Sequence, residues 1–441
     1  MDVLILGAGM AGLTAARALA ERGLRVCVLE ARPRVGGRIL SQKVEGGGTD
    51  ELGAEFVHGR APELWALIDE AGAKTVERQG SMLRERHPGS LVADDPEDNA
   101  MFEPLEQLEA PDQLAKFAVE DQAFADWLAA SNVAAELRPG LTAYVEGFNA
   151  ADAQRISARS LGIQQQAEDA TEADRSWHLP GGYAQLPDYL AARVKEFGGE
   201  IRLGCQVLGI RWTPGEVRAE TTDGEFIAPR CIVTFPLGVL HQINRPGGIA
   251  ITPEPAAIAQ SRRLAMGHAA RFTMIFSTKY WQFSQLFDRE TLRSMSFLFT
   301  FSHIPPVWWT SHPDPDSLPA LTGWIGGPRA SALEGKAPDE LGSAACVTLA
   351  KIFALDEHLV RSALVATYSH DWAADPFARG AYSYVPVGAV DASSAMTQPE
   401  ADTLFFAGEH TDITGNWGTV HAALRSGLRA AAQILKERAT T

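Results

Sequence analysis

The first thirty residues combine two apolar runs with a glycine-rich turn. The run Val3 to Leu6 leads directly into Gly7-Ala8-Gly9-Met10-Ala11-Gly12. Apolar residues then recur at helical spacing at Leu13, Ala16 and Leu19, and a second apolar run, "RVCVLE", ends at Glu30. This pattern predicts a buried strand, a tight turn, an amphipathic helix and a second buried strand.

The C-terminal segment shows a related order of elements. "TLFFAGEH" reads as a buried strand ending at Gly408-Glu409, and a helix is predicted to begin near Gly418. The predicted apolar face of this helix consists of Val420, Leu424, Gly427, Leu428, Ala431 and Leu435. In contrast, residues 80–112, including "ADDPEDNA", are polar and proline-bearing, which is typical of a surface connection.

Composition narrows the function classes. The chain has 441 residues, long enough for two or three folding units, and a formal charge of −16, which repels phosphate backbones, so we expect no nucleic-acid partner. The four cysteines form no CxxC pair; we expect no metal site and a cytoplasmic location. No stretch approaches the ~20 apolar residues of a membrane helix, so no membrane partner is expected.

The glycine turn has the spacing of a dinucleotide fingerprint. Gly7 permits the tight turn, Gly9 lets backbone approach a pyrophosphate, and Gly12 lets helix and strand pack closely. Glu30, at the end of the second strand, is placed to accept hydrogen bonds from an adenosine ribose. A lone GxGxxG is a weak signal, but here strand, helix, second strand and acid agree.

A second glycine pair follows in "EARPRVGGR", where Gly36, Gly37 and Arg38 come soon after the ribose-binding acid. With these motifs the chain resembles the flavin-dependent amine oxidases along nearly its whole length, and most closely their polyamine-oxidase and histone-demethylase branch. The resemblance implies an α/β fold with a Rossmann-like FAD-binding domain of the GR2 type and an interleaved α+β substrate domain. It assigns residues 1–79, 179–262 and 376–441 to the FAD-binding domain, and residues 80–178 and 263–375 to the substrate domain.

The resemblance also implies which residues contact FAD. The dinucleotide contacts are Gly7, Ala8, Gly9, Met10, Ala11, Gly12, Glu30, Ala31, Arg32, Gly36, Gly37, Arg38 and Val207. Nearer the flavin ring and the ribityl chain are Gly53, Ala54, Glu55, Trp372, Gly408, Glu409, Gly418, Thr419 and Val420. The N-terminus of the helix that begins near Gly418 would stabilise the negative charge of a reduced flavin.

The segment "WAADPFARGAYSYVPVG" resembles the one that brings an aromatic residue in front of the flavin, here Tyr382. Ala381 and Thr419 occupy the positions where monoamine oxidases carry the FAD-attaching cysteine and a second tyrosine. The resemblance therefore implies non-covalent FAD and a site open on one side, although Tyr382 could instead pack in a core. His58 and Trp308 are taken as substrate contacts; His58 could equally cap a loop, and aromatic residues such as Trp308 more often pack.

Arg271 is the largest departure from the family pattern. It occupies the position of a lysine that holds a water against flavin N5 and assists the reaction with dioxygen. Arginine keeps the charge, but its wider fork would displace that water and slow reoxidation, so that another acceptor would be preferred. In the alternative, Arg271 pairs with an acid such as one in the segment Glu51 to Glu55, and dioxygen reacts normally.

Together these features predict an FAD-dependent amine oxidase with Arg271, Tyr382 and Thr419 at its catalytic end. It would pass a hydride from a small-molecule amine, polyamine-like or otherwise secondary or primary, to flavin N5. The imine would hydrolyse to an aldehyde, and dioxygen or another acceptor would take the electrons. Two alternatives stay open: an L-amino-acid oxidase or other FAD enzyme of the same scaffold, and a non-catalytic flavoprotein that binds a partner. The oligomeric state is not predicted.

Overall fold

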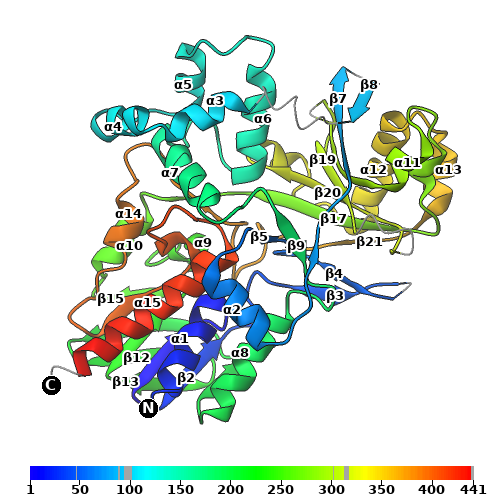
Figure 1. Ribbon diagram of the computed structural model, residues 1–441. Coiled ribbons are helices and arrows are strands. Elements are labelled where there is room, and N and C mark those ends of the chain that lie inside the picture. Colours follow the sequence, from blue (N-terminus) through cyan, green and yellow to red (C-terminus); the bar gives the residue numbers. More distant parts are fainter. Residues whose placement is uncertain (46, 88–89, 94–101, 301, 312–316, 439–441) are drawn as a thin grey trace.

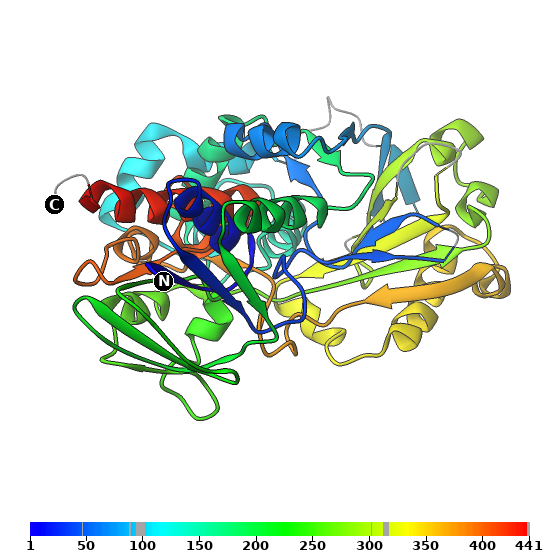
Figure 2. The same ribbon diagram turned by 90° about the horizontal axis from the view of Figure 1, so that it is seen from below.

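The computed structural model describes residues 1–45, 47–87, 90–93, 102–300, 302–311 and 317–438. The N-terminal, central green and C-terminal red segments come together in one lobe, while the yellow segments and most of the cyan ones occupy the other (Figure 1). Seen from below, the sheets of these two lobes lie on opposite sides of the molecule (Figure 2). Among the described residues, no helix is long and apolar enough to cross a bilayer.

A parallel five-stranded sheet forms the centre of the first lobe. Its order is β10 (Glu200–Leu203), β2 (Val26–Glu30), β1 (Val3–Leu6), β14 (Arg230–Val233) and β23 (Leu404–Phe406). Alternate residues of β1 belong to different cores: Val3 and Ile5 pack on the helical side, and Leu4 and Leu6 on the other. This arrangement confirms the predicted α/β fold and its opening strand, turn, helix and strand.

Helices α1 (Met10–Ala20), α2 (Pro62–Glu70), α8 (Gln185–Glu196) and α15 (Val420–Arg438) pack on one face of this sheet. Helix α1 packs against both α8 and α15, and α2 packs on α15. Gly427 permits the close approach of α15 to α1, because a Cβ there would lie 2.3 Å from the backbone oxygen of Ala11. The prediction that Leu428 is on the buried face is wrong: it is 42% exposed, because the buried face of α15 is displaced around the helix and includes Ala430 and Ile434 instead.

The opposite face carries a second, four-stranded sheet. Its order is β13 (Gly224–Ala228), β12 (Glu216–Thr221), β11 (Val207–Thr213) and β15 (Ala250–Thr252). Two short helices, α9 (Leu237–Leu240) and α10 (Ala256–Ser261), complete the core on this side. Val207, at the start of β11, is thereby brought beside the first lobe's nucleotide motifs.

A seven-stranded sheet forms the second lobe. Its order is β21 (Leu364–Ser369), β17 (Ala269–Phe276), β20 (Ala320–Gly326), β19 (Val307–Thr310), β18 (Met295–Phe299), β7 (Ser81–His87) and β8 (Ser90–Ala93). Helix α12 (Pro338–Ile352) packs on β17 and β21, and α13 (Glu357–Ala363) packs on α12. The interpretation of residues 80–112 as a plain surface connection is therefore wrong for β7 and β8, whereas residues 94–101 lie outside the described part of the chain.

The strand β7 was missed because its sequence is mostly polar and one of its two partner strands is distant. On one side it forms a hairpin with the adjacent β8. It pairs in parallel with β18, more than two hundred residues later, and this pairing buries Leu83 completely. A cluster of helices adjoins this sheet: α3 (Glu103–Glu106), α4 (Pro111–Val119), α5 (Phe124–Ala130), α6 (Arg138–Asn149) and α7 (Ala158–Asp169).

The remaining elements are short. They are β3 (Ser41–Lys43), β4 (Thr49–Glu51), β5 (Val57–His58), β6 (Val76–Glu77), β9 (Ser176–His178), β16 (Ala265–Met266), β22 (Ser383–Tyr384), α11 (Arg289–Arg293), α14 (Ala392–Ala395) and the 3-10 turns η2 (Gln107–Glu109), η3 (Tyr280–Phe283), η4 (Pro328–Ala332) and η5 (Glu409–Thr411). The small sheet β5-β9-β6 brings His58 close to the junction of the two lobes.

Candidate active site

A cavity of 1130 Å³ is lined by residues of both lobes. Small-molecule sites usually enclose ~300–1,000 Å³, so this cavity has room for a dinucleotide and a further ligand. All predicted cofactor residues except Ala8 and Gly12 line it. The prediction that Ala8 and Gly12 contact the cofactor is wrong, because neither residue lines the cavity. Both are buried in the turn and shape it instead.

The three fingerprint glycines have different roles. A Cβ on Gly12 would lie 1.9 Å from the backbone oxygen of Gly7, and Gly7 itself has φ +111°. These two glycines let the turn fold. Gly9 is different, because a Cβ there would meet nothing within 4 Å, and Gly9 lines the cavity. The open space beside Gly9 is thus available to a ligand.

The N-terminus of α1 leaves its backbone N–H groups without side-chain partners. Gly9 is the N-cap and makes no side-chain hydrogen bond, and the first turn carries no acidic residue. Unsatisfied N–H groups and the positive end of the helix dipole make such a terminus an anion-binding site. A pyrophosphate fits here.

Glu30 is held in place at the end of β2. It is 5% exposed, and its two oxygens accept hydrogen bonds from the backbone N–H groups of Ala8 (2.8 Å) and Arg32 (2.9 Å). The carboxylate lines the cavity and keeps lone pairs for further donors. This arrangement fits a pair of ribose hydroxyls.

The GGR segment connects to the C-terminal motif. Arg38 donates to the backbone oxygen of Ala381 (2.8 Å) and to Glu409 (2.9 Å). Glu409 also accepts from Ser383 Oγ (2.5 Å) and from the Gly418 backbone N–H (3.0 Å). Burial opposes ionisation of Glu409, but Arg38 prevails and holds its pKa below the usual value. Glu409 therefore joins Arg38 to the start of α15.

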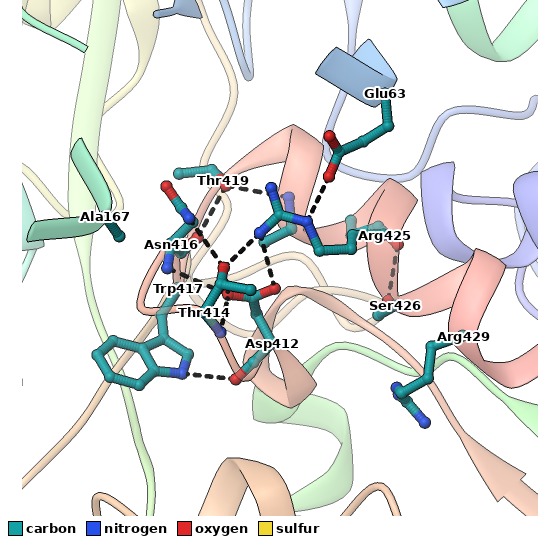
Figure 3. Close-up of polar contacts among 12 residues, drawn as sticks. Glu63, Ala167, Asp412, Thr414, Asn416, Trp417, Thr419, Arg425, Ser426 and Arg429 are labelled. Atoms are coloured by element: carbon teal, nitrogen blue, oxygen red, sulfur yellow. Dashed lines mark hydrogen bonds and ion pairs between the residues drawn. The ribbon is translucent and has the colours of Figure 1, made fainter. Parts of the chain in front are cut away.

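The loop before α15 is organised by Asp412 (Figure 3). The Asp412 carboxylate, 1% exposed, accepts from the backbone N–H groups of Thr414 (2.9 Å) and Asn416 (3.1 Å). Arg425 on α15 donates to Thr414 Oγ1 and also to Glu63 on α2. These contacts hold the segment Asn416 to Val420, which lines the cavity.

The Thr419 hydroxyl hydrogen-bonds to backbone groups at the start of α15. Its Oγ1 accepts from the backbone N–H of Ala422 (3.1 Å) and donates to the backbone oxygen of Asn416 (2.8 Å). Thr419 therefore caps the first turn of α15 while lining the cavity, as a threonine at a helix start commonly does.

The far end of the cavity is aromatic. Tyr382 lines it, donates its hydroxyl to the backbone oxygen of Phe148 (2.6 Å), and lies parallel to Trp324 with ring centroids 6.5 Å apart. Phe56, Phe148, Phe297, Trp309, Trp324 and Tyr382 share this wall. Tyr382 is therefore a cavity residue, as predicted from its segment, and not a plain core residue.

The prediction that Trp308 contacts substrate is wrong. Trp308 is fully buried, packs edge-on against Phe272 at 5.8 Å, and donates to the backbone oxygen of Pro305. Side chains of a strand alternate between its faces, so in β19 Trp309 faces the cavity and Trp308 faces the core. Alternation shows that only one of the two tryptophans can face the cavity, but which one depends on the orientation of β19 in the sheet.

His58 and His421 line the cavity. His58 lies edge-on to Phe56 (5.7 Å) and Phe148 (6.4 Å), and burial lowers its pKa to about 4. His421, in the first turn of α15, is 3% exposed; burial lowers its pKa to about 4, and its Nε2 has no hydrogen-bond partner. Both are uncharged at neutral pH. His421 was missed because "TVHAAL" reads only as an apolar helix start.

Arg271 lies in a buried ion pair. Its guanidinium donates to Glu55 (2.6 Å) and approaches Asp50 (3.5 Å), while Trp309 Nε1 also donates to Glu55. Burial favours the neutral form of Glu55, but the Arg271 charge holds its pKa below the usual value. The pairing expected in the second alternative for Arg271 is thus present.

A group of acids also borders the cavity at the end of α7. Glu168, Asp169, Glu172 and Asp174 line it. Glu168 accepts from Gln164 Nε2 (2.8 Å), and burial raises its pKa to about 7. A cationic group at this end of the cavity could form an ion pair with one of these carboxylates.

Comparison with known proteins decides the family. The model of the flavin containing amine oxidoreductases matches residues 10–435, almost the whole chain. The chain belongs to this family. FAD is its cofactor, and the open helix N-terminus, the anchored Glu30 and the free space at Gly9 all fit it. With Ala381 beside Tyr382 in place of a cysteine, this amine oxidoreductase holds FAD without a covalent link.

Individual relatives fall in two groups. A lysine-specific histone demethylase 1 homolog 3 of Oryza sativa subsp. japonica is 28% identical over 98% of this chain, which spans only 54% of that relative. Polyamine oxidase 1 of the same subspecies is 27% identical over 98% of this chain and 97% of its own. The chain thus spans about half the length of the demethylase relatives, but nearly all of a polyamine oxidase.

A solved structure shares the fold. A putrescine oxidase bound to putrescine superposes with a TM-score of 0.83 at 21% identity, covering 99% of both chains. This likeness shows that the two proteins share the two-lobed fold.

Proposed function

We propose that this protein is an FAD-dependent amine oxidase that acts on a diamine or polyamine. One observation carries the proposal: a single cavity joins the dinucleotide site at α1 to the aromatic wall around Tyr382. When bound, FAD supplies the acceptor for the two electrons of the amine C–H bond. The C–N bond becomes an imine, and water hydrolyses the imine to an aldehyde and ammonia, or an aldehyde and an amine where the substrate is a secondary amine. Dioxygen is reduced to hydrogen peroxide.

The residues around the aromatic wall suit an uncharged amine at the reacting end. Tyr382, Trp324 and Phe148 offer apolar surface that excludes water. His58 lies beside them and is neutral, so it does not repel an arriving cation. Removal from water disfavours the charged form of an amine, so the apolar wall favours loss of the ammonium proton.

The acids at the end of α7 support a substrate with a second cationic group. We propose that Glu168 binds the far ammonium of a diamine or polyamine. The names of the relatives, polyamine oxidase and putrescine oxidase, agree with this substrate class. They favour it over an amino acid, and over a flavoprotein without catalytic activity.

Replacing Glu168 by glutamine is expected to raise KM for putrescine by about tenfold, because one charge-assisted hydrogen bond to the substrate is lost. The value of kcat should change little. KM for butylamine, which has no second ammonium, should stay the same. Because burial raises the pKa of Glu168 to about 7, more carboxylate forms as pH rises from 6 to 8, so the native KM for putrescine should fall over that range. Steady-state kinetics with both amines checks this; an equal change for butylamine would refute the assignment.

We propose that dioxygen is the electron acceptor. Arg271 is drawn toward Glu55 and Asp50, which supports the alternative in which its fork does not displace a water beside the flavin. Stopped-flow reoxidation should therefore be fast in the native protein, and Arg271→Lys should leave the rate essentially unchanged. A slow native rate that lysine accelerates would instead favour another acceptor.

We further propose a cytoplasmic setting and the domain division given by residues 1–79, 179–262 and 376–441 against 80–178 and 263–375. The four cysteines are free and buried, which suits a reducing compartment. Strands from the first set of ranges build the five-stranded sheet, and strands from the second set build the seven-stranded sheet. The acidic charge disfavours nucleic acid as a partner.

A further inference from the structure

The segment Asp371 to Gly380 crosses from the second lobe to the nucleotide end of the cavity. It leaves the edge strand β21 and leads toward β22. Trp372, Phe377 and Arg379 line the cavity, and Trp372 Nε1 donates to the backbone oxygen of Leu52 (2.7 Å). The segment therefore borders the cofactor site from outside the glycine-rich fingerprint and the GGR motif.

Asp375 links this segment to Arg32, which lies two positions after Glu30, the acid predicted to bind the ribose. Arg32 donates to Asp375 Oδ1 at 2.6 Å, and the two side chains are 11% and 8% exposed. His370 Nε2 lies 2.8 Å from Asp375 Oδ2. Asp375 Oδ1 also accepts from the Phe377 backbone N–H (2.8 Å), so the carboxylate is fixed from three sides.

The Arg32 guanidinium is further restrained by aromatic rings. It lies over Phe377 at 5.3 Å and over Trp372 at 6.0 Å. Burial opposes ionisation of Asp375, but the hydrogen bonds from His370 and Arg32 hold its pKa well below the usual range. Asp375 is thus a permanent anion that keeps Arg32 turned toward the segment 371–380.

We propose that Asp375 is a positioning residue for FAD, which holds Arg32 away from Glu30 and so keeps the Glu30 carboxylate free for the adenosine ribose. Arg32 already donates its backbone N–H to Glu30 Oε1 at 2.9 Å, so its side chain starts close to that carboxylate. Without Asp375, the guanidinium and Glu30 would form a charge-assisted pair, which competes with neutral ribose hydroxyls. Loss of Asp375 therefore accelerates the release of FAD. The inference rests on FAD binding and not on the identity of the amine.

The test is the rate of FAD release from the holoenzyme, followed by the rise of flavin fluorescence after dilution into a flavin-binding trap protein. Asp375→Asn keeps the acceptor for Phe377 N–H but removes the charge, and release should become at least about tenfold faster because a freed guanidinium outcompetes hydroxyl donors for a carboxylate. Asp391→Asn is the matched control, since Asp391 pairs with Arg263 at the surface and does not line the cavity. Its release rate should equal that of the native protein.

A double-mutant cycle separates positioning from general stabilisation. In Arg32→Met no guanidinium can compete for Glu30, so adding Asp375→Asn should not change the release rate of Arg32→Met. If Asp375→Asn accelerates release by the same factor in both backgrounds, or releases FAD at the native rate, the proposal is overturned. Should Asp375→Asn not fold, His370→Gln provides the second variant: it loosens Asp375 and should accelerate release in the same direction, and a native rate would contradict the proposal.

Discussion

Gly9→Ala is expected to lower the affinity for FAD by at least about tenfold, or 1.4 kcal/mol, without changing the stability of the apoprotein. A Cβ at Gly9 meets no protein atom within 4 Å, and its φ of −78° is open to alanine. The added methyl group would instead occupy the space where backbone must approach a pyrophosphate. Equilibrium titration of the apoprotein with FAD gives the affinity, and thermal unfolding of the apoprotein gives the stability.

Gly12→Ala is the matched comparison on the same helix. Its Cβ would lie 1.9 Å from the backbone oxygen of Gly7, so the turn must shift and both stability and affinity should fall. If Gly9→Ala binds FAD as well as the native protein does, the pyrophosphate does not approach α1 as the fingerprint predicts. If Gly9→Ala destabilises the apoprotein as much as Gly12→Ala does, the distinction between the two glycines is wrong.

Arg271→Met is expected to reduce the free energy of unfolding by about 3–5 kcal/mol, the usual cost of leaving buried carboxylates without their partner. The Arg271 side chain is 4% exposed, and those of Glu55 and Asp50 are 9% and 13% exposed. Arg271→Lys keeps the charge and should lose much less stability. Denaturant unfolding of both variants measures the difference; equal losses would show that shape, and not charge, matters at this position.

The pH dependence of this loss has a definite sign. The pKa of Glu55 lies below its ordinary value of 4.5 in the folded protein, because Arg271 outweighs the effect of burial. A carboxyl group with a lowered pKa stabilises the fold above its unfolded pKa, and this contribution disappears as pH falls through the folded value. The stability gap between native protein and Arg271→Met should therefore be full at neutral pH and shrink below pH 4.5.

Local patterns predicted the parts of the site that are built from neighbouring residues. The strand, turn and helix around Gly7 to Gly12 and the start of α15 near Gly418 follow from periodicity and backbone requirements, which a short stretch carries by itself. The ion pair of Arg271 with Glu55 was foreseen only as an alternative. Its presence depends on how β17 approaches the segment after β4, which sequence spacing does not specify.

Features that rest on distant pairing could not be predicted. β7 pairs with both the adjacent β8 and the distant β18, whereas its own polar sequence favours a connection. Arg32 and Asp375 are 343 positions apart, and nothing in either motif indicates that they meet. Trp308 and Trp309 are adjacent and chemically alike, so only the direction in which β19 faces the cavity tells them apart.

Anaerobic mixing of the purified holoprotein with a panel of diamines, polyamines, monoamines and amino acids tests the central claim most directly. The account predicts that putrescine or a polyamine removes the yellow absorbance of the flavin within a catalytic turnover, that monoamines do so more slowly, and that amino acids leave it unchanged. Flavin absorbance that persists with every amine, or that only an amino acid removes, would contradict the assignment of this protein as a diamine or polyamine oxidase.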